Sequence, residues 1–392
     1  MNTATPPYKR PLIILVASAS IFLFGAGLTT LGSVIPELKT KFALDAIGVG
    51  AIFSVLPLGI LGGSLLFGPI ADRFGYRLML GISCLLICLG LSGIAHAGSL
   101  WMLKLAVFCF GTGGGAINGG TSAAVSDISE RKGAALSLLG VFFGLGALIL
   151  PLVFGVAQGH FTNESIITVL SWISFFTAVG IFFIPFPAPK HLSKFPLTEA
   201  VGLFKNKLLL LISFFLFCQS SFEGIINNWT TLYLTEYLNL PVEKALFSLS
   251  VLMMGITLTR LITGTVFRNV DQQPIIYCSL FLLFAGTLLL HLGGTFPLAA
   301  AGLFLMGSGL AGGFPIMLGF VGKKFPDLSG TAFSFVLVIA LFGNMVVNYF
   351  MGIIGKRYGI VQLVSFCYAE IVLMTIICFF IIRNLNASKT SS

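Results

Sequence analysis

Charge is scarce in this sequence: only 9% of its 392 residues are Asp, Glu, Lys or Arg, whereas 57% are hydrophobic. A soluble domain carries about 25% charged residues. A chain with so few cannot cover its apolar side chains with a polar surface of its own, which excludes an ordinary soluble protein. The composition therefore predicts an all-α polytopic membrane protein, because helices satisfy their own backbone hydrogen bonds in lipid.

Catalytic and metal-binding motifs are also lacking. The four His are dispersed at span ends and loops, and no HExxH, GxSxG or CxxC pattern occurs. The seven Cys lie in apolar segments, where Cys behaves as a small hydrophobe. We therefore expect neither an enzyme nor a bound metal or cofactor. The net charge of +9 is no sign of nucleic-acid binding, because the basic residues come in twos and threes between apolar runs.

The sequence does contain apolar runs long enough to cross a bilayer, which takes about 20 residues. Both termini lie on one side if the number of spans is even. Of the 22 Lys and Arg, fifteen fall on the side of the termini and six on the other, so the positive-inside rule predicts cytoplasmic termini in a cell membrane, such as a bacterial inner membrane. Twelve spans are predicted: 12–35, 47–71, 78–97, 100–126, 133–157, 165–185, 208–233, 245–267, 274–292, 296–321, 329–354 and 361–383.

The longest polar connection, 186–207, is rich in Pro and basic residues and separates six spans from six. Two parallel six-span repeats would give this arrangement. We therefore expect an N-terminal six-helix bundle over 1–185, a cytoplasmic linker over 186–207 and a C-terminal six-helix bundle over 208–392.

The seventh span carries an unusual set of polar residues. Gln219, Glu223 and Asn227 are four residues apart, so a helix places them on one face, and Asn228 and Trp229 follow directly. An ionisable side chain at membrane depth is costly and usually functional. We expect these residues to bind a small-molecule substrate, and Glu223 also to bind a coupling proton, because burial favours the neutral form of a carboxyl group.

Other spans add further polar candidates. Asn118 lies among glycines in the fourth span, and Asn344 and Asn348 are four residues apart in the eleventh. Each is expected either to hydrogen-bond a neighbouring helix or to line the substrate cavity. Arg260 in the eighth span is expected to have a structural or gating role, and Glu370 in the twelfth a structural or lipid-facing one.

The loop between the second and third spans reads GPIADRFGYR. Here Gly68, Asp72, Arg73, Gly75 and Arg77 match the G-x-x-x-D-R/K-x-G-R/K-R/K motif of the major facilitator superfamily, with Tyr76 in place of a basic residue. The chain resembles that superfamily along its whole length. The resemblance implies the major facilitator fold, transport by alternating access, and a conformational latch at these five residues.

Within the superfamily, the chain resembles the fucose, galactose and glucose proton symporters in FFLFCQSSFEGIINNW of the seventh span and in GFPIMLGFVGKKFPDLSGTAFSF of the tenth and eleventh. It lacks the acidic residues that some of them carry in spans one and four, which leaves Glu223 to couple protons. The resemblance implies transport of a small polar solute, a sugar or related metabolite, by a monomer in the lipid bilayer. The alternative is a proton-coupled exporter of amphipathic compounds or drugs.

Overall fold

The computed structural model describes residues 8–129, 132–157, 159–187, 206–266, 270–325 and 329–390. Over these ranges the chain is helical apart from short connections, and twelve helical segments are long and apolar enough to cross a membrane. The prediction of an all-α polytopic membrane protein with twelve transmembrane helices is confirmed. The helices of the first half are α1 (Arg10–Lys41), α2 (Ala46–His96), α3 (Leu100–Ile128), α4 (Lys132–Ala157) and α5 (Asn163–Phe183).

Helix α2 contains two of the predicted spans. Its two membrane-crossing parts, Ala46–Gly68 and Arg73–His96, are joined through Gly75, whose φ of 84° and ψ of 161° are not helical. This region of backbone torsions is essentially restricted to glycine. The chain therefore changes direction at Gly75, and helical backbone continues on both sides of this residue.

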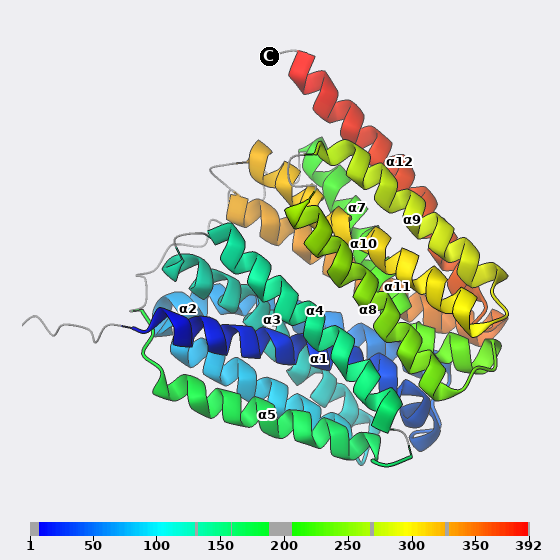
Figure 1. Cartoon of the computed structure of the whole chain (residues 1–392), viewed down its shortest axis with the longest axis horizontal. Coiled ribbons are helices and arrows are strands. Elements are labelled where there is room, and N and C mark those ends of the chain that lie inside the picture. Colours follow the sequence, from blue (N-terminus) through cyan, green and yellow to red (C-terminus); the bar gives the residue numbers. More distant parts are fainter. Residues whose placement is uncertain are drawn as a thin grey trace, which may run out of the picture. The chain divides into compact units, whose positions relative to one another are not determined.

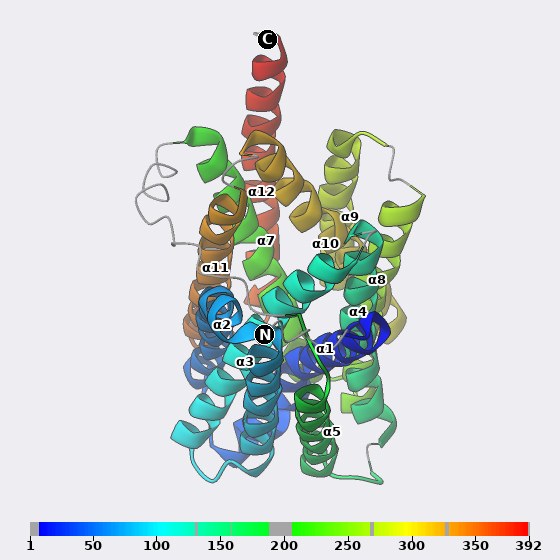
Figure 2. The ribbon, with the colours of Figure 1, turned by 90° about the vertical axis from the view of Figure 1, so that its left-hand side faces the viewer.

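In the second half, α7 (Lys207–Leu232) runs into one π-helical turn, η1 (Tyr233–Tyr237). Helix α10 packs against α8 and α9, and α7 packs against α11 and α12 (Figures 1 and 2). Close approach of α9 and α10 depends on glycine, because a Cβ at Gly286 would lie 2.5 Å from the carbonyl oxygen of Gly302. The remaining helices are α8 (Val242–Thr265), α9 (Gln272–Leu292), α10 (Phe296–Lys324), α11 (Ser329–Tyr358) and α12 (Gln362–Thr390).

Polar side chains mark where several helices begin. The hydroxyl of Ser99 accepts the N–H of Met102 at 3.2 Å at the start of α3, and the amide oxygen of Asn206 accepts the N–H of Leu209 at 3.1 Å at the start of α7. Such N-caps satisfy backbone donors that have no partner within the helix. The start of α7 is thus encoded locally, at the last two residues of the connection predicted as a linker.

The chain divides into two compact units. The first combines Met1–Val34 with Val55–Lys194, and the second combines Ile35–Ser54 with Phe195–Ser392. The end of α1 and the beginning of α2 therefore belong, by their contacts, to the second unit. The boundaries 1–185, 186–207 and 208–392 stay predictions, and most of the expected linker lies outside the described residues.

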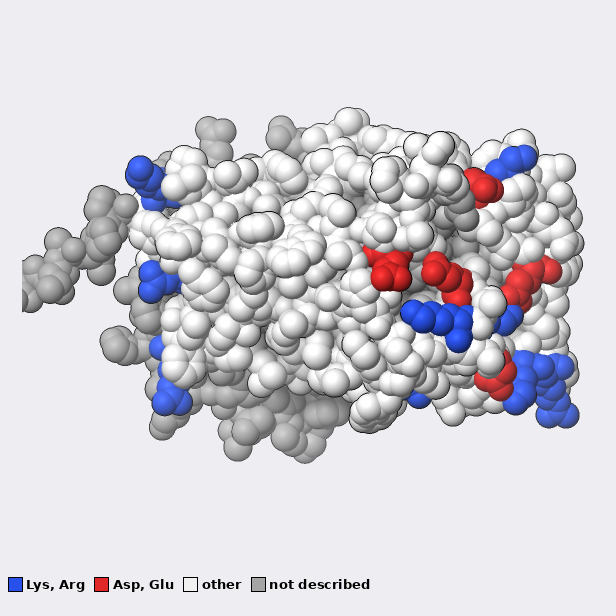
Figure 3. Space-filling model, turned by 90° about the horizontal axis from the view of Figure 1, so that it is seen from below, with Lys and Arg blue, Asp and Glu red and all other residues white. Residues whose placement is uncertain are grey.

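A wide part of the visible surface carries no charged side chain among the described residues. In Figure 3 an uncharged band lies between two charged ends. Among the described residues in view, Lys and Arg but no Asp or Glu are visible at the end where α1 begins, whereas the opposite end shows both signs. This distribution is typical of a protein whose middle faces lipid.

Candidate functional site

Helix α7 is the centre of the candidate site. Together with η1 it is the most buried of the described membrane-crossing segments. Gln219, Asn227, Asn228 and Trp229 are each at most 6% exposed, and Glu223 is half-buried. The polar residues of this helix therefore lie inside the protein and do not face lipid. Their hydrogen-bond partners must come from other groups of the protein or from a bound molecule.

The predicted residues of α7 fall into two sets with different surroundings. We call Gln219, Glu223, Asn227 and Thr231 the acceptor stripe, because they continue one four-residue spacing along α7. The sequence-based prediction omitted Thr231, although the spacing leads directly to it. We call Asn228, Trp229, Asn344 and Asn348 the amide cluster, which joins α7 to α11.

The polar groups of the amide cluster hydrogen-bond within it or to the main chain, except Oδ1 of Asn228, which has no partner among the described residues. The amide oxygen of Asn348 accepts from Nδ2 of Asn228 and from Nε1 of Trp229, both at 3.1 Å. Nδ2 of Asn348 donates to both oxygens of Asn344 at 2.9 Å, and Nδ2 of Asn344 donates to the main-chain oxygen of Ser220 at 2.9 Å. The bonds that cross from Asn228, Trp229 and Ser220 to α11 hold α7 and α11 together at membrane depth.

The indole ring of Trp229 in the cluster is also covered by another aromatic side chain. Trp229 is 1% exposed, and its ring meets that of Phe53 edge-on, with centroids 5.4 Å apart. Phe53 comes from the early part of α2 that belongs to the second unit. In this conformation Trp229 therefore contributes to packing, and contact with a substrate would require the ring to be uncovered.

The acceptor stripe, in contrast, contains oxygens without donors. Nε2 of Gln219 donates to the main-chain oxygen of Leu310 at 3.0 Å, but Oε1 of Gln219 has no partner among the described residues. The same holds for Oδ1 of Asn227 and Oγ1 of Thr231. Buried polar atoms are rarely left unpaired, so these three oxygens are suited to accept hydrogen bonds from a bound molecule.

Glycine makes room beside the stripe. A Cβ at Gly313 of α10 would overlap the side-chain amide of Gln219. Any other residue at this position would therefore displace Gln219 from its bond to Leu310. The glycine-rich middle of α10 is thus part of the local architecture that positions the stripe.

Glu223 lies near one positive charge. Arg260 of α8 is half-buried and interacts electrostatically with Glu223. No hydrogen bond or ion pair joins these two described side chains, and Nε of Arg260 has no partner among the described residues. Glu223 therefore keeps carboxyl oxygens available for a proton or a ligand, and Arg260 faces the site from the neighbouring helix.

Glu370 of α12 is a second carboxyl group beside α7. It is 5% exposed and hydrogen-bonds with the hydroxyl of Ser221, while its Oε2 has no partner among the described residues. A lipid-facing position, one of the two sequence-based expectations, is not what the structure shows. The pairing with Ser221 was missed, because residues 149 positions apart carry no spacing signal.

Asn118 belongs to a different unit from the two sets. It lies in α3 of the first unit, its side chain is exposed, and its main-chain oxygen accepts from the hydroxyl of Ser122 at 2.8 Å. A role of Asn118 in the substrate cavity stays a prediction.

The latch motif lies at the bend of α2. Gly75 forms the bend itself, Arg73 and Arg77 are exposed, and Tyr76, where the motif has a basic residue, donates to the carboxylate of Asp127 in α3 at 2.8 Å. Nothing lies within 4 Å of a Cβ built at Gly68. The side chain of Asp72 is outside the described residues, so its role in a latch stays a prediction.

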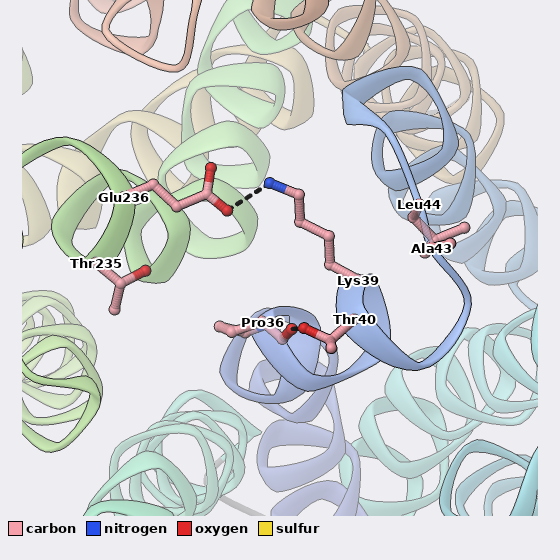
Figure 4. A pocket seen from close by; sticks show the side chains of 7 residues that line it. All are labelled: Pro36, Lys39, Thr40, Ala43, Leu44, Thr235 and Glu236. Carbon is pink, nitrogen blue, oxygen red and sulfur yellow. Dashed lines mark hydrogen bonds and ion pairs between the residues drawn. The ribbon is translucent and has the colours of Figure 1, made fainter.

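A pocket missed by sequence reasoning lies in the second unit at the end of α1. Its volume is about 410 Å³, and Lys39 of α1 reaches across it to Glu236 of η1 at 2.5 Å (Figure 4). We call it the α1–η1 pocket. The residues that line it are Pro36, Lys39, Thr40, Ala43, Leu44, Thr235 and Glu236.

A second ion pair lies in the same part of the chain. Asp45, between α1 and α2, pairs with Lys356 of α11 at 2.8 Å and accepts the N–H of Gly48 at 2.8 Å. Both contacts stabilise the carboxylate and hold the pKa of Asp45 below its usual value. The segment Ile35–Ser54 is thus fastened to α7, η1 and α11 by charges as well as by the Phe53 ring.

Most of the chain is similar to known proteins. Residues 17–347 match the model of the Major Facilitator Superfamily. The Inner membrane transport protein YdiN of Escherichia coli (strain K12) is 25% identical over 95% of this chain and 91% of its own length. The Glucose/mannose transporter GlcP of Bacillus subtilis (strain 168) is 25% identical over 84% of this chain and 85% of its own.

Solved structures show the same fold. The nucleoside transporter NupG superposes with a TM-score of 0.81 at 16% identity, covering 95% of this chain and 99% of that one. A D-xylose-proton symporter gives a TM-score of 0.78 at 14% identity, covering 94% and 96%. At such identities the likeness concerns the arrangement of helices and not the substrate.

Proposed function

The chain belongs to the major facilitator superfamily and is a membrane transporter rather than an enzyme, and we propose that it moves a small polar solute, a sugar or related metabolite, with Glu223 as the proton-binding residue. The observation that carries this proposal is the acceptor stripe. Three of its side chains present buried oxygens that lack donors, and the fourth is a carboxyl group.

A solute rich in hydroxyl groups fits such a stripe. Each hydroxyl can donate one hydrogen bond to an amide or hydroxyl oxygen. Gln219, Asn227 and Thr231 offer three such acceptors, spread over about three turns of α7. A purely apolar compound would leave the three oxygens unsatisfied, which opposes its binding. The stripe therefore favours a polar solute over the amphipathic compounds of the alternative hypothesis.

The relatives are consistent with this proposal. One is named a glucose/mannose transporter, and one of the similar structures is named a D-xylose-proton symporter. Their names describe those proteins only. They support a sugar as the first solute class to test, ahead of nucleosides, amino acids and organic acids.

The proposal also includes an orientation in the membrane and two ion pairs that open and close during transport. The excess of Lys and Arg on the side of the termini favours cytoplasmic termini, which puts the α1–η1 pocket on the extracellular side. Alternating access requires contacts at each side to form and break in turn. The ion pairs of Lys39 with Glu236 and of Asp45 with Lys356 are exposed enough to be exchanged for water during such a cycle.

Ligand-dependent stabilisation of the purified protein tests the substrate class. A ligand that binds the folded state at 100 times its Kd adds about 2.7 kcal/mol to the free energy of unfolding. We expect a sugar to raise the Tm and Asn227→Ala to weaken that shift. The proposed solute class would be wrong if amphipathic compounds stabilise the protein and no polar solute does.

Transport in proteoliposomes tests the role of Glu223. We expect an inward proton gradient to drive accumulation by the wild type, and Glu223→Gln to abolish accumulation while retaining exchange of labelled for unlabelled solute. Glu243→Gln, an exposed carboxyl group in the first turn of α8, is the matched control and should behave like the wild type. Unchanged pH dependence in Glu223→Gln would exclude Glu223 as the coupling residue.

A further inference from the structure

The contact between α7 and α12 contains a carboxyl group that the proposed transport mechanism does not use. Glu370 is about two helical turns from the start of α12 and 5% exposed, and it faces Ser221 of α7, which is fully buried. The two helices lie side by side in Figures 1 and 2. A carboxylate at this depth has to be compensated by donors or by a positive charge.

The hydrogen bonds available to Glu370 do not compensate a negative charge. Ser221 has a single hydroxyl proton, and its oxygen also lies 2.8 Å from the main-chain oxygen of Phe217 and 3.0 Å from that of Cys218. When the hydroxyl proton points to one of these carbonyls, the bond to Glu370 needs a proton from the carboxyl group. The other carboxyl oxygen, Oε2, has no donor among the described residues.

Among the described side chains of the helices around it, no positive charge interacts with Glu370. The titratable groups on which Glu370 acts electrostatically are two thiols, Cys218 of α7 and Cys367 of α12 itself. Helices α9 and α11 also pack against α12, and none of their titratable side chains interacts with Glu370. Those side chains are Tyr277, Cys278, His291, Tyr349, Lys356, Arg357 and Tyr358.

From this geometry we infer that Glu370 is a second proton-binding site of the transporter, occupied in this conformation, where the protonated carboxyl group bridges α12 to Ser221 of α7. Loss of that proton leaves a charge that one hydroxyl cannot stabilise in a dry contact. The contact between α7 and α12 then opens to water. The inference goes beyond the proposed function, because it does not require Glu223 to bind a proton.

Infrared difference spectroscopy at neutral pH reports the protonation state directly. We expect a carbonyl stretching band of a protonated carboxylic acid in the wild type and in Glu223→Gln, and its loss in Glu370→Gln. Ser221→Ala removes the hydrogen-bond partner, so the band should shift to higher frequency and not vanish. Persistence of the whole band in Glu370→Gln, or an ionised Glu370 in Ser221→Ala, would overturn the inference.

Thiol labelling provides a second measurement that does not depend on transport. Cys218 and Cys367 flank Glu370 and are 5% and 0% exposed. As pH rises, both should become reactive in the wild type more steeply than in Glu370→Gln, which cannot acquire a charge. Cys84, buried in the first unit, corrects for the general rise of thiolate with pH. Identical labelling of the two proteins at every pH would contradict the inference.

Discussion

The acceptor stripe lies on α7, and the amide cluster joins α7 to α11. Both contain buried side-chain amides, yet their hydrogen bonding differs. In the cluster, Asn348 uses its amide oxygen twice and its amide nitrogen twice. In the stripe, Gln219, Asn227 and Thr231 each leave an oxygen without a partner among the described residues, whereas in the cluster Oδ1 of Asn228 alone does so. Burial alone therefore does not reveal the role of an amide. Its role depends on which hydrogen-bond partners the neighbouring helix offers.

The difference follows from what each face of α7 meets. The face of Asn228 meets α11, where Asn344 and Asn348 supply complementary groups one turn apart. The face of Gln219 meets the glycine-rich middle of α10, where Leu310 offers a main-chain oxygen and no described residue offers a donor for Oε1. We infer that the cluster holds the fold and that the stripe is kept free for the solute.

The largest effect is expected from breaking the cluster at its centre. Asn348→Ala removes the acceptor of two buried donors, on Asn228 and Trp229. We expect the free energy of unfolding to fall by about 1–3 kcal/mol, measured by thermal unfolding in detergent. The matched control is Asn227→Ala, the same chemical change at a buried residue whose oxygen has no partner, which should alter stability by less than about 1 kcal/mol.

The same pair of variants should behave oppositely towards the solute. Asn227→Ala is expected to weaken binding about tenfold, which corresponds to about 1.4 kcal/mol, because a stripe oxygen that accepts from the solute is lost. The folded fraction of Asn348→Ala should bind within about threefold of the wild type. Calorimetric titration measures both, and equal losses in the two variants would remove the distinction between stripe and cluster.

The exposed ion pair in the α1–η1 pocket should contribute less than either buried set. Lys39→Glu brings a carboxylate towards Glu236, with which Lys39 now pairs at 2.5 Å. Because partly exposed pairs are worth about 0.2–1 kcal/mol, we expect a small drop in Tm that high salt reduces. The charge-reversed double variant Lys39→Glu with Glu236→Lys should recover the loss, and failure to recover it would indicate that the pair has no specific role.

The smallest effect on stability is expected when pH changes the protonation of Asp45, which pairs with Lys356. Lys356 and the N–H of Gly48 hold the pKa of Asp45 below its usual value, so the folded state binds the proton less readily than the unfolded chain. The stabilisation is therefore complete above the unfolded value of about 3.9 and is lost as pH falls through the lowered pKa. Thermal unfolding of the wild type and Asp45→Asn between about pH 3 and pH 6 should converge at the acidic end.

Most of the fold followed from composition and spacing. Twelve apolar runs separated by polar loops predicted the helices, because backbone groups in lipid have to bond within their own segment. The two runs that α2 contains are an instructive case, since Gly75 lets a predicted loop become a bend between two helical stretches. The grouping of Ile35–Ser54 with the second unit had no local signal, because it rests on contacts with residues some 200 to 300 positions away.

The site was predicted in part. The four-residue spacing on α7 placed Gln219, Glu223 and Asn227 along the helix as the structure has them. Spacing could not show that Asn228 and Trp229 turn to α11, or that Glu370 reaches Ser221. Hydrogen bonds between distant segments depend on which helices pack against each other. Helix packing cannot be read from the residue spacing of a single sequence.

The sequence alone thus determined that this protein is a helical membrane protein with one unusually polar span, since hydrophobicity and helical period act within each segment. Only the tertiary structure decided which polar groups of that span are satisfied and which are left open. The physical reason is that a side-chain amide satisfies its hydrogen bonds with whatever lies opposite: α11 presents amides to Asn228, whereas α10 presents glycine to Gln219.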